Sequence, residues 1–293
     1  MKRFIIYFTV LFAIISVLAQ LNDMLCVWLI RHAGSSSAGK MERLWKNPEH
    51  DEIPIFGSSR ALGNFIPSVI SPKCFNYGCN GMGKKEVTFL MKVAANRSCK
   101  EPIIINFDPW QSNLGASFVG DYRLVPESKR LSLKECIPGL RFHGALKSSL
   151  TEYLNSRKAV TKVIDHGAEL LKNSRSVEEW KIINARQRSQ SYYQDPALDE
   201  PFESVIHSFA PRTVYIVICP CSSHWTSLYN GINNLYKYLE HIKLTCPNVV
   251  IINLFNDPSF SDDDFTDATH LNIHGAEKLS QKVSNLLSSD KTP

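Results

Sequence analysis

Two short segments far apart in the chain carry residue types that suit nucleophilic catalysis. The first, "IFGSSRALGNFIP" at 55–67, is an apolar run that leads directly into Gly57, Ser58, Ser59 and Arg60. A serine on a tight turn at the carboxyl end of a strand stands exposed where a substrate can reach it. Glycine and serine are also common wherever a strand passes into a loop. The segment by itself therefore leaves a nucleophile and an ordinary strand exit both open.

The second segment, "DATHLNIHGA" at 267–276, lies near the end of the chain and pairs Asp267 with His270. A carboxylate three residues from an imidazole can accept its Nδ1 proton, which leaves Nε2 free to take a proton from a hydroxyl. The alternative is that Asp267 belongs to a solvated acidic loop with residues 262–264 and that His270 only starts a helix. His274 is a rival base, although it falls within the first turn of that helix.

The elements that must position these residues are visible as apolar runs. Five of them predict strands, at 52–57, 71–78, 101–110, 213–220 and 248–255. The last three are almost continuously apolar, which is typical of parallel strands buried on both faces. Helical spacing at 83–96, at 224–243 and in a terminal amphipathic segment predicts the crossover helices. We expect an α/β fold, a flavodoxin-like three-layer αβα sandwich around a central, mostly parallel sheet.

In such a sheet the carboxyl ends of the strands meet at one edge. The loops after the first and fifth strands are therefore expected to converge, which brings Ser59 toward His270. The middle region, at about 140–195, shows three helical patterns and no strand, at 146–155, 159–173 and 176–193. It is predicted to be a helical insertion between the third and fourth strands.

The N-terminus places Lys2 and Arg3 before an uncharged apolar run from Phe4 to Ala19. This pattern indicates a signal peptide or an N-terminal membrane anchor. Residues 1–23 are predicted to form that segment, 24–47 a connection, and 48–293 one α/β domain. The positive flank predicts an exported protein, anchored with its domain outside the cytoplasm, or secreted if the segment is cleaved.

Composition narrows the classes of partner. A net charge of +5 over 293 residues, with no Lys/Arg run interleaved with aromatic residues, gives no support for nucleic acid as a partner. Of the eight cysteines, Cys219 and Cys221 form a "CPC" at the end of an apolar run with no matching second pair. That spacing argues against a metal site. Buried thiols and one or two disulfides both remain open.

Three motifs, "GSSRA", "NYGCNG" and "DATHLNIHGA", occur in an order that resembles the SGNH (GDSL-like) hydrolases. Within that superfamily the chain is most similar to the exported "GSSR" branch, related to cell-envelope acyl esterases and O-acyltransferases. The resemblance covers most of residues 53–287. It implies that Ser59 is the nucleophile, His270 the general base and Asp267 its orienting partner, with Ser58 in place of the family's aspartate.

The same resemblance implies an oxyanion hole, built from the backbone amides of Ser59 and of Gly81, the last glycine of "NYGCNG". Many members add an asparagine from a third block, Gly-x-Asn-Asp, but this chain has "NFDPW" at 106–110 with Asp108. An ionised carboxylate cannot donate a hydrogen bond. The role of this donor could fall to Asn106, to Trp110 or to Gln111. The remaining alternative is a hole formed by the two backbone amides alone.

Five residues are predicted to bind substrate around this site: Arg60, Asp108, Trp110, His224 and Trp225. For Arg60 the alternative is a structural role that anchors the loop through Asp108. His224 and Trp225 follow the fourth strand and are expected at the same edge of the sheet. For His224 the alternative is a residue that only begins a helix.

The resemblance and the N-terminal pattern together imply an extracytoplasmic serine esterase or O-acyltransferase acting on acyl esters, chiefly acetyl esters, of cell-envelope carbohydrate. The expected partners are the acylated carbohydrate, or another small ester, and the membrane. No metal or organic cofactor is required. The alternative is a catalytically inactive SGNH-fold protein that binds or assembles envelope components. A nucleotide binder is disfavoured because the first strand is not followed by a glycine-rich loop that opens directly into a helix.

Overall fold

The computed structural model describes residues 1–32, 40, 43–44, 51–96, 98–108, 137–138, 146–147, 150–151, 153–154, 162–171, 182–186 and 200–289. The chain divides into two compact units. One comprises Met1–Lys46 and Val119–Val160, and the other comprises Asn47–Phe118 and Thr161–Pro293. All the strands formed by described residues lie in the second unit.

The first unit contains the helix α1, Lys2–His32, which extends well beyond the predicted apolar run. Within Lys2–Leu29 the mean hydropathy reaches 2.4, and this is the one helix among the described residues that is long and apolar enough to cross a membrane. At 1.5 Å per residue a helix of 31 residues measures about 46 Å, more than the ~30 Å hydrocarbon core of a bilayer. An apolar helix at this place is consistent with either a signal sequence or an anchor.

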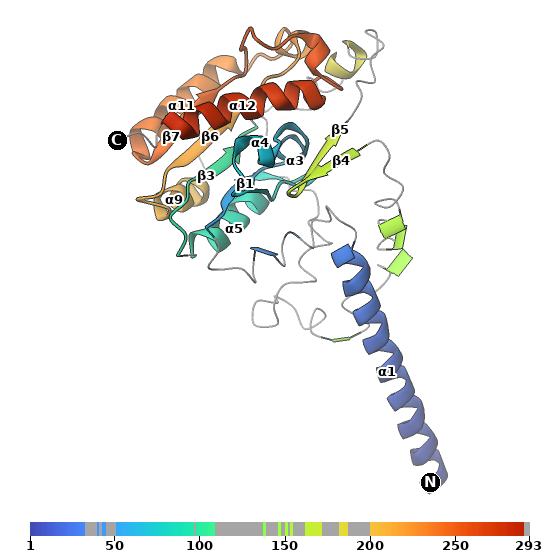
Figure 1. Cartoon of the computed structure of the whole chain (residues 1–293). Coiled ribbons are helices and arrows are strands. Elements are labelled where there is room, and N and C mark those ends of the chain that lie inside the picture. Colours follow the sequence, from blue (N-terminus) through green and yellow to red (C-terminus); the bar gives the residue numbers. More distant parts are fainter. Residues whose placement is uncertain are drawn as a thin grey trace. The chain divides into compact units, whose positions relative to one another are not determined.

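The second unit is built on a five-stranded sheet with the order β2-β1-β3-β6-β7, in which every neighbouring pair is parallel (Figure 1). The predicted α/β sandwich with its parallel sheet is confirmed. The five strands fall within the five predicted runs: β1 Ile53–Phe56, β2 Cys74–Asn76, β3 Ile103–Asn106, β6 Val214–Ile218 and β7 Val249–Asn253.

Helices cover the two faces of this sheet. On one face Ile55, Ile104 and Val217 join a single apolar core with α4, Pro67–Ile70, and α12, Ile273–Ser289, and α3, Ser59–Asn64, packs against α12. On the other face lie α5, Lys84–Ala95, α9, Glu200–Ser208, and α11, Ile232–Thr245. There Phe107, which follows β3, packs its ring on Phe202 of α9 and Tyr238 of α11. Successive strand residues thus alternate between two buried faces, which explains their continuous apolar character.

The prediction of a helix at 159–173 is wrong. This segment forms an antiparallel hairpin of β4, Lys162–Asp165, and β5, Ala168–Leu171. The two turn residues, His166 and Gly167, both have positive φ, 39° and 88°, as the favoured two-residue hairpin turns require. Ala168 and Leu170 are buried in the same core as α4 and α12, and β5 packs against α3, the helix that begins with Ser59.

The described residues of the other two patterns in the predicted insertion are helical. The predicted helix at 224–243 is interrupted. It forms the short α10, Ser223–Thr226, and then α11, which begins after Gly231. The terminal amphipathic helix is present as α12, in which Leu287 packs into the core and Leu286 is exposed.

Candidate active site

The turn after β1 lies where the strand order of the sheet reverses. In the order β2-β1-β3-β6-β7 the chain runs outward from β1 in one direction and from β3 in the other, and ligands of such sheets bind at this reversal. Gly57, at φ 150°, leaves β1, and a Cβ there would come within 2.7 Å of Ala61 and 2.9 Å of Asn106. Only glycine fits this turn, and the turn delivers Ser59 to the first position of α3.

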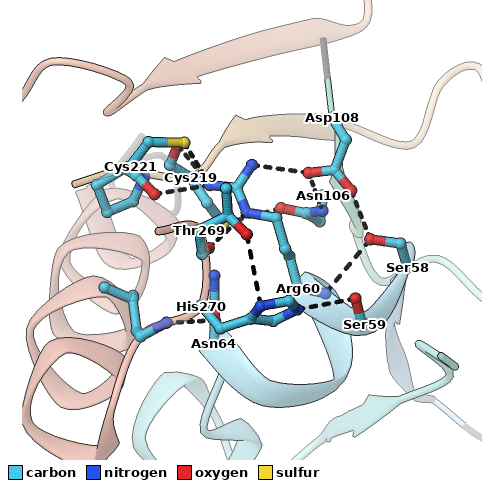
Figure 2. Close-up of polar contacts among 12 residues, drawn as sticks. Ser58, Ser59, Arg60, Asn64, Asn106, Asp108, Cys219, Cys221, Thr269 and His270 are labelled. Carbon is cyan, nitrogen blue, oxygen red and sulfur yellow. Dashed lines mark hydrogen bonds and ion pairs between the residues drawn. The ribbon is translucent and has the colours of Figure 1, made fainter. Parts of the chain in front are cut away.

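Three side chains from the two ends of this unit form one hydrogen-bonded chain. The Oγ of Ser59 lies 2.9 Å from Nε2 of His270 (Figure 2). The other ring nitrogen, Nδ1, lies 3.0 and 2.9 Å from the two carboxylate oxygens of Asp267. A carboxylate accepts only, so Nδ1 carries the proton and Nε2 is left as the acceptor for the Ser59 hydroxyl. The side chain of His270 is 18% exposed, which leaves the site open to a small substrate.

Asp267 is held in place by its own loop. Its Oδ1 accepts hydrogen bonds from the backbone N–H groups of Thr269, at 2.8 Å, and His270, at 2.9 Å. The loop is tied to α3, because the N–H of Leu271 donates to Oδ1 of Asn64 at 3.0 Å. The carboxylate that orients the imidazole is therefore itself oriented by the backbone, on a loop attached to the helix of the nucleophile.

The two alternatives for this loop fit the structure less well. His274 is 78% exposed in the first turn of α12, and its Nδ1 lies 4.0 Å from Glu277. Asp262 and Asp264 bind Ser223 and Lys278, respectively, whereas Asp267 faces the imidazole. Asp262, Asp264 and Asp267 thus have separate partners and do not form one solvated group.

The segment that contains Gly81 runs beside the exit of β1. The N–H of Tyr77 donates to the carbonyl of Ile55 at 2.8 Å, and the N–H of Cys79 donates to the carbonyl of Gly57 at 3.3 Å. Gly81 is exposed, with φ 70°, a backbone conformation that favours glycine. The turn that follows β2 thus passes next to the turn that holds Ser59.

Asn106 does not face the site as a donor. It is fully buried, its Nδ2 donates to Oδ1 of Asp108 at 3.1 Å, and its Oδ1 accepts from Sγ of Cys219 at 2.8 Å. Both ends of the amide are used inside the protein. The suggested oxyanion role of Asn106 is therefore not supported by its position.

Arg60 and Asp108 are interior residues, so the prediction that they bind substrate is wrong, and the structural alternative for Arg60, a contact with Asp108, is the one observed. Their side chains are 2% and 3% exposed and form an ion pair of 2.8 Å. Asp108 also accepts a hydrogen bond from Oγ of Ser58 at 2.5 Å. It therefore acts only as an acceptor and does not supply the side-chain donor of an oxyanion hole. Burial by itself lowers the pKa of the Arg60 guanidinium, but the Cys221 sulfur and the Asp108 carboxylate raise that pKa well above its usual range. The cation is retained in the interior.

Trp225 and His224, which were both predicted to bind substrate from the loop after β6, lie in different environments. Trp225 is fully buried, with its ring stacked on Tyr229 at 4.8 Å and edge-on to Phe255 at 5.8 Å, so it belongs to the core and the prediction of a cleft residue is wrong. His224 is 31% exposed and its Nε2 lies 3.5 Å from Oδ2 of Asp262. Trp110 and Gln111 lie outside the described residues.

The seven cysteines that the structure describes are all buried thiols. Burial raises the pKa of Cys219 and of Cys221 to about 12, so both stay protonated near neutral pH. Within the described ranges no three His, Cys, Asp or Glu side chains gather as a metal site would require.

Sequence reasoning missed two residues that shape the site, Asn64 and Thr269. Asn64 binds the backbone of the loop after His270, and the carbonyl of Thr269 accepts from Arg60. Neither has a sequence signal of its own. The only signal in the sequence was indirect. Arg60 next to Ser59 and Asp108 after the neighbouring strand predict an ion pair at this edge of the sheet, but not the residues that this pair contacts.

Comparisons with known proteins add little to this geometry. No family model matches the chain, and no curated protein matches it. A solved structure from Streptococcus pneumonia, provisionally named a platelet activating factor, is similar over 89% of this chain and 94% of its own, with 13% identity and a TM-score of 0.43. A likeness at this level carries no argument about function. The fold assignment rests on the sheet topology described above.

Proposed function

We propose that the protein is a serine hydrolase or acyltransferase of ester bonds, with Ser59 as nucleophile, His270 as general base and Asp267 as its orienting partner. The observation that carries this proposal is the hydrogen-bonded order Ser59 Oγ, His270 Nε2, His270 Nδ1, Asp267. This is the order that nucleophilic acyl transfer requires, since the base must lie between the hydroxyl and the carboxylate.

In the first half-reaction, Nε2 of His270 takes the proton from Ser59 as Oγ bonds to the ester carbonyl carbon. The carbonyl oxygen becomes an oxyanion, for which the amides of Ser59 and Gly81 are the proposed donors. When the tetrahedral intermediate collapses, the bond to the leaving oxygen breaks and His270 returns the proton to it. The products are an alcohol and an acyl group esterified to Ser59.

In the second half-reaction, an acceptor hydroxyl loses its proton to His270 and attacks the acyl carbon, and Ser59 regains its hydroxyl proton. Water as the acceptor gives a free acid, which makes the protein an esterase. A carbohydrate hydroxyl gives a new ester, which makes it an O-acyltransferase. The proposed substrate is an acylated, chiefly acetylated, carbohydrate of the cell envelope. The apolar helix α1 and its positive flank support that location.

The oxyanion hole is expected to accelerate the reaction less than one that has a side-chain donor. Asp108 and Asn106 use their polar atoms within the interior, so neither supplies the side-chain donor. Loss of one such donor costs about 10²–10³ in rate in enzymes where it has been removed. The same departure supports a second candidate, a binding or assembly protein of the envelope that has kept the site without turnover.

Hydrolysis of a chromogenic acetyl ester by the full chain in detergent separates the two candidates. His270→Ala is expected to abolish turnover, because no base remains beside Ser59. His274→Ala is the matched control, since it removes an exposed imidazole four residues away and is expected to leave turnover unchanged. Turnover that survives in His270→Ala would contradict the assignment of His270 as the base, and a folded wild type without turnover would favour the binding role.

A further inference from the structure

The guanidinium of Arg60 contacts three separate segments of the chain (Figure 2). Its Nη1 donates to Asp108 at 2.8 Å, just after β3, and its Nη2 donates to the carbonyls of Cys219, at 3.0 Å, and Pro220, at 2.6 Å, just after β6. Its Nε donates to the carbonyl of Thr269 at 2.9 Å. The first two segments are exits from the sheet, and the third is the loop that carries His270.

The hydrogen bond from Arg60 to the carbonyl of Thr269 joins residues that are adjacent in sequence to the proposed nucleophile and base. Arg60 directly follows Ser59, and Thr269 directly precedes His270. The Thr269 residue is held from both sides, since its N–H donates to Asp267 and its carbonyl accepts from Arg60. One side chain therefore connects the two halves of the site through the immediate neighbours of the proposed nucleophile and base.

We propose that Arg60 is a positioning residue of this site, whose buried guanidinium holds the Thr269 carbonyl and thereby sets the distance between Ser59 Oγ and His270 Nε2. The inference rests on the proposed function and deepens it. It also explains Asp108, which is present as the counter-ion that makes a buried arginine tolerable next to the nucleophile, and not as a ligand for substrate.

The residue type fits this task. A guanidinium has five N–H donors in a planar fork, which lets it reach a carboxylate and several carbonyls in different directions at once. A lysine ammonium has three donors on one nitrogen and cannot span the same acceptors. Burial of the charge is compensated, because Asp108 is fixed in turn by Ser58 and Asn106. The network is therefore rigid, as a positioning element must be.

The test compares Arg60→Lys with Arg212→Lys in the full chain. Arg212 is the matched control, because its Nε also donates to a backbone carbonyl, that of Glu101 at 2.7 Å, but just before β6, at the opposite end of the strands from the site. Two quantities are measured: the kinetics with which a fluorophosphonate labels Ser59, and the far-downfield proton NMR signal of the His270 Nδ1–H.

For Arg60→Lys we expect kinact to fall by about 10²-fold with little change in KI, since a shift of about 1 Å between reacting groups has that effect. We also expect the His270 signal to shift or disappear. Arg212→Lys is expected to change neither quantity. Labelling at the wild-type rate together with an unchanged signal in Arg60→Lys would overturn the inference.

Two further arms keep this test decisive. If Arg60→Lys does not fold, the double variant Arg60→Met, Asp108→Leu removes the ion pair without leaving one charge buried and unpaired, and the same losses are expected. If the wild type is not labelled, the proposed function fails, and the inference is judged by the NMR signal alone. A signal that is absent from the wild type, or unchanged in the Arg60 variants, would then overturn it.

Discussion

Two clusters at the same edge of the sheet contain a serine, a histidine and an aspartate, and they differ in how the three are connected. At Ser59 the imidazole lies between the hydroxyl and the carboxylate. In the second cluster Asp262 takes the central place. It accepts from Oγ of Ser223 at 2.6 Å, and Nε2 of His224 lies 3.5 Å from it.

The difference shows that the order of connection, not the set of residue types, decides the chemistry. The hydroxyl of Ser223 donates its proton to the carboxylate of Asp262, which is a much weaker base than imidazole. Its hydrogen bond is thus made to an oxygen and not to a ring nitrogen. The hydroxyl of Ser59 is directed to a nitrogen whose opposite side is fixed by Asp267. The second cluster serves instead to fasten the turn after β6 to the loop of Asp262.

The largest expected effect separates the two serines. Ser59→Ala is expected to lower ester turnover by about 10³-fold or more, because the nucleophile is lost. Ser223→Ala removes an equally hydrogen-bonded hydroxyl from the same edge of the sheet and is expected to keep turnover within about twofold. Steady-state rates of the two variants with one acetyl ester measure the contrast. A large loss in Ser223→Ala would erase the distinction between the clusters.

The second effect separates the two carboxylates. Asp267→Asn is expected to reduce turnover by about 10³–10⁴-fold, because an amide presents the wrong group to Nδ1 and disturbs the tautomer. Asp262→Asn changes a carboxylate of the same loop that binds Ser223 and lies near His224, so its rate is expected to stay near that of wild type. Equal rates in the two variants would contradict the assigned order of connection.

The smallest effect concerns stability alone and involves a third carboxylate, Asp257, in the loop after β7. Burial raises its pKa, but hydrogen bonds from Ser259 and the Lys282 ammonium outweigh burial, and the net pKa is lowered. A lowered folded-state pKa stabilises the protein above the unfolded pKa, and that contribution disappears as the pH falls through the folded value. Asp257→Asn should therefore lower stability at pH 7 by about 0.5 kcal/mol and have no effect at strongly acid pH.

Thermal unfolding midpoints of the wild type and Asp257→Asn at both pH values measure this difference. Ester turnover at pH 7 should not change, which distinguishes this carboxylate from Asp267. A stability difference that grows as the pH falls would show that the sign of the linkage is wrong.

The sheet could be predicted from the sequence because its strands are buried on both faces and are therefore continuously apolar. The hairpin at 162–171 could not, because Val163, Ile164, Leu170 and Leu171 also match helical spacing and only the backbone of His166-Gly167 reveals the turn. The pairing of Asp267 with His270 followed from their spacing, and the approach of His270 to the turn after the first strand followed from the convergence of loops at one sheet edge. The choice of Ser59 was what the resemblance implied.

The surroundings of these three residues could not be predicted in the same way. The acceptors of Arg60 lie 48, 159 and 209 residues away in the chain, so its burial depends on the complete fold. Trp225 lies at the expected edge, but proximity to a strand end does not tell which way a ring points, and α10 turns it into the core.

The central claim is that Ser59, among the serines gathered at this edge, is the activated one. The most direct test is to treat the folded full chain with a fluorophosphonate and to locate the adduct by fragment-ion mass spectrometry, which distinguishes Ser58, Ser59 and Ser223. The account predicts one adduct, on Ser59, that is lost in His270→Ala. An adduct on Ser58 or Ser223, or labelling of Ser59 that does not depend on His270, would contradict it.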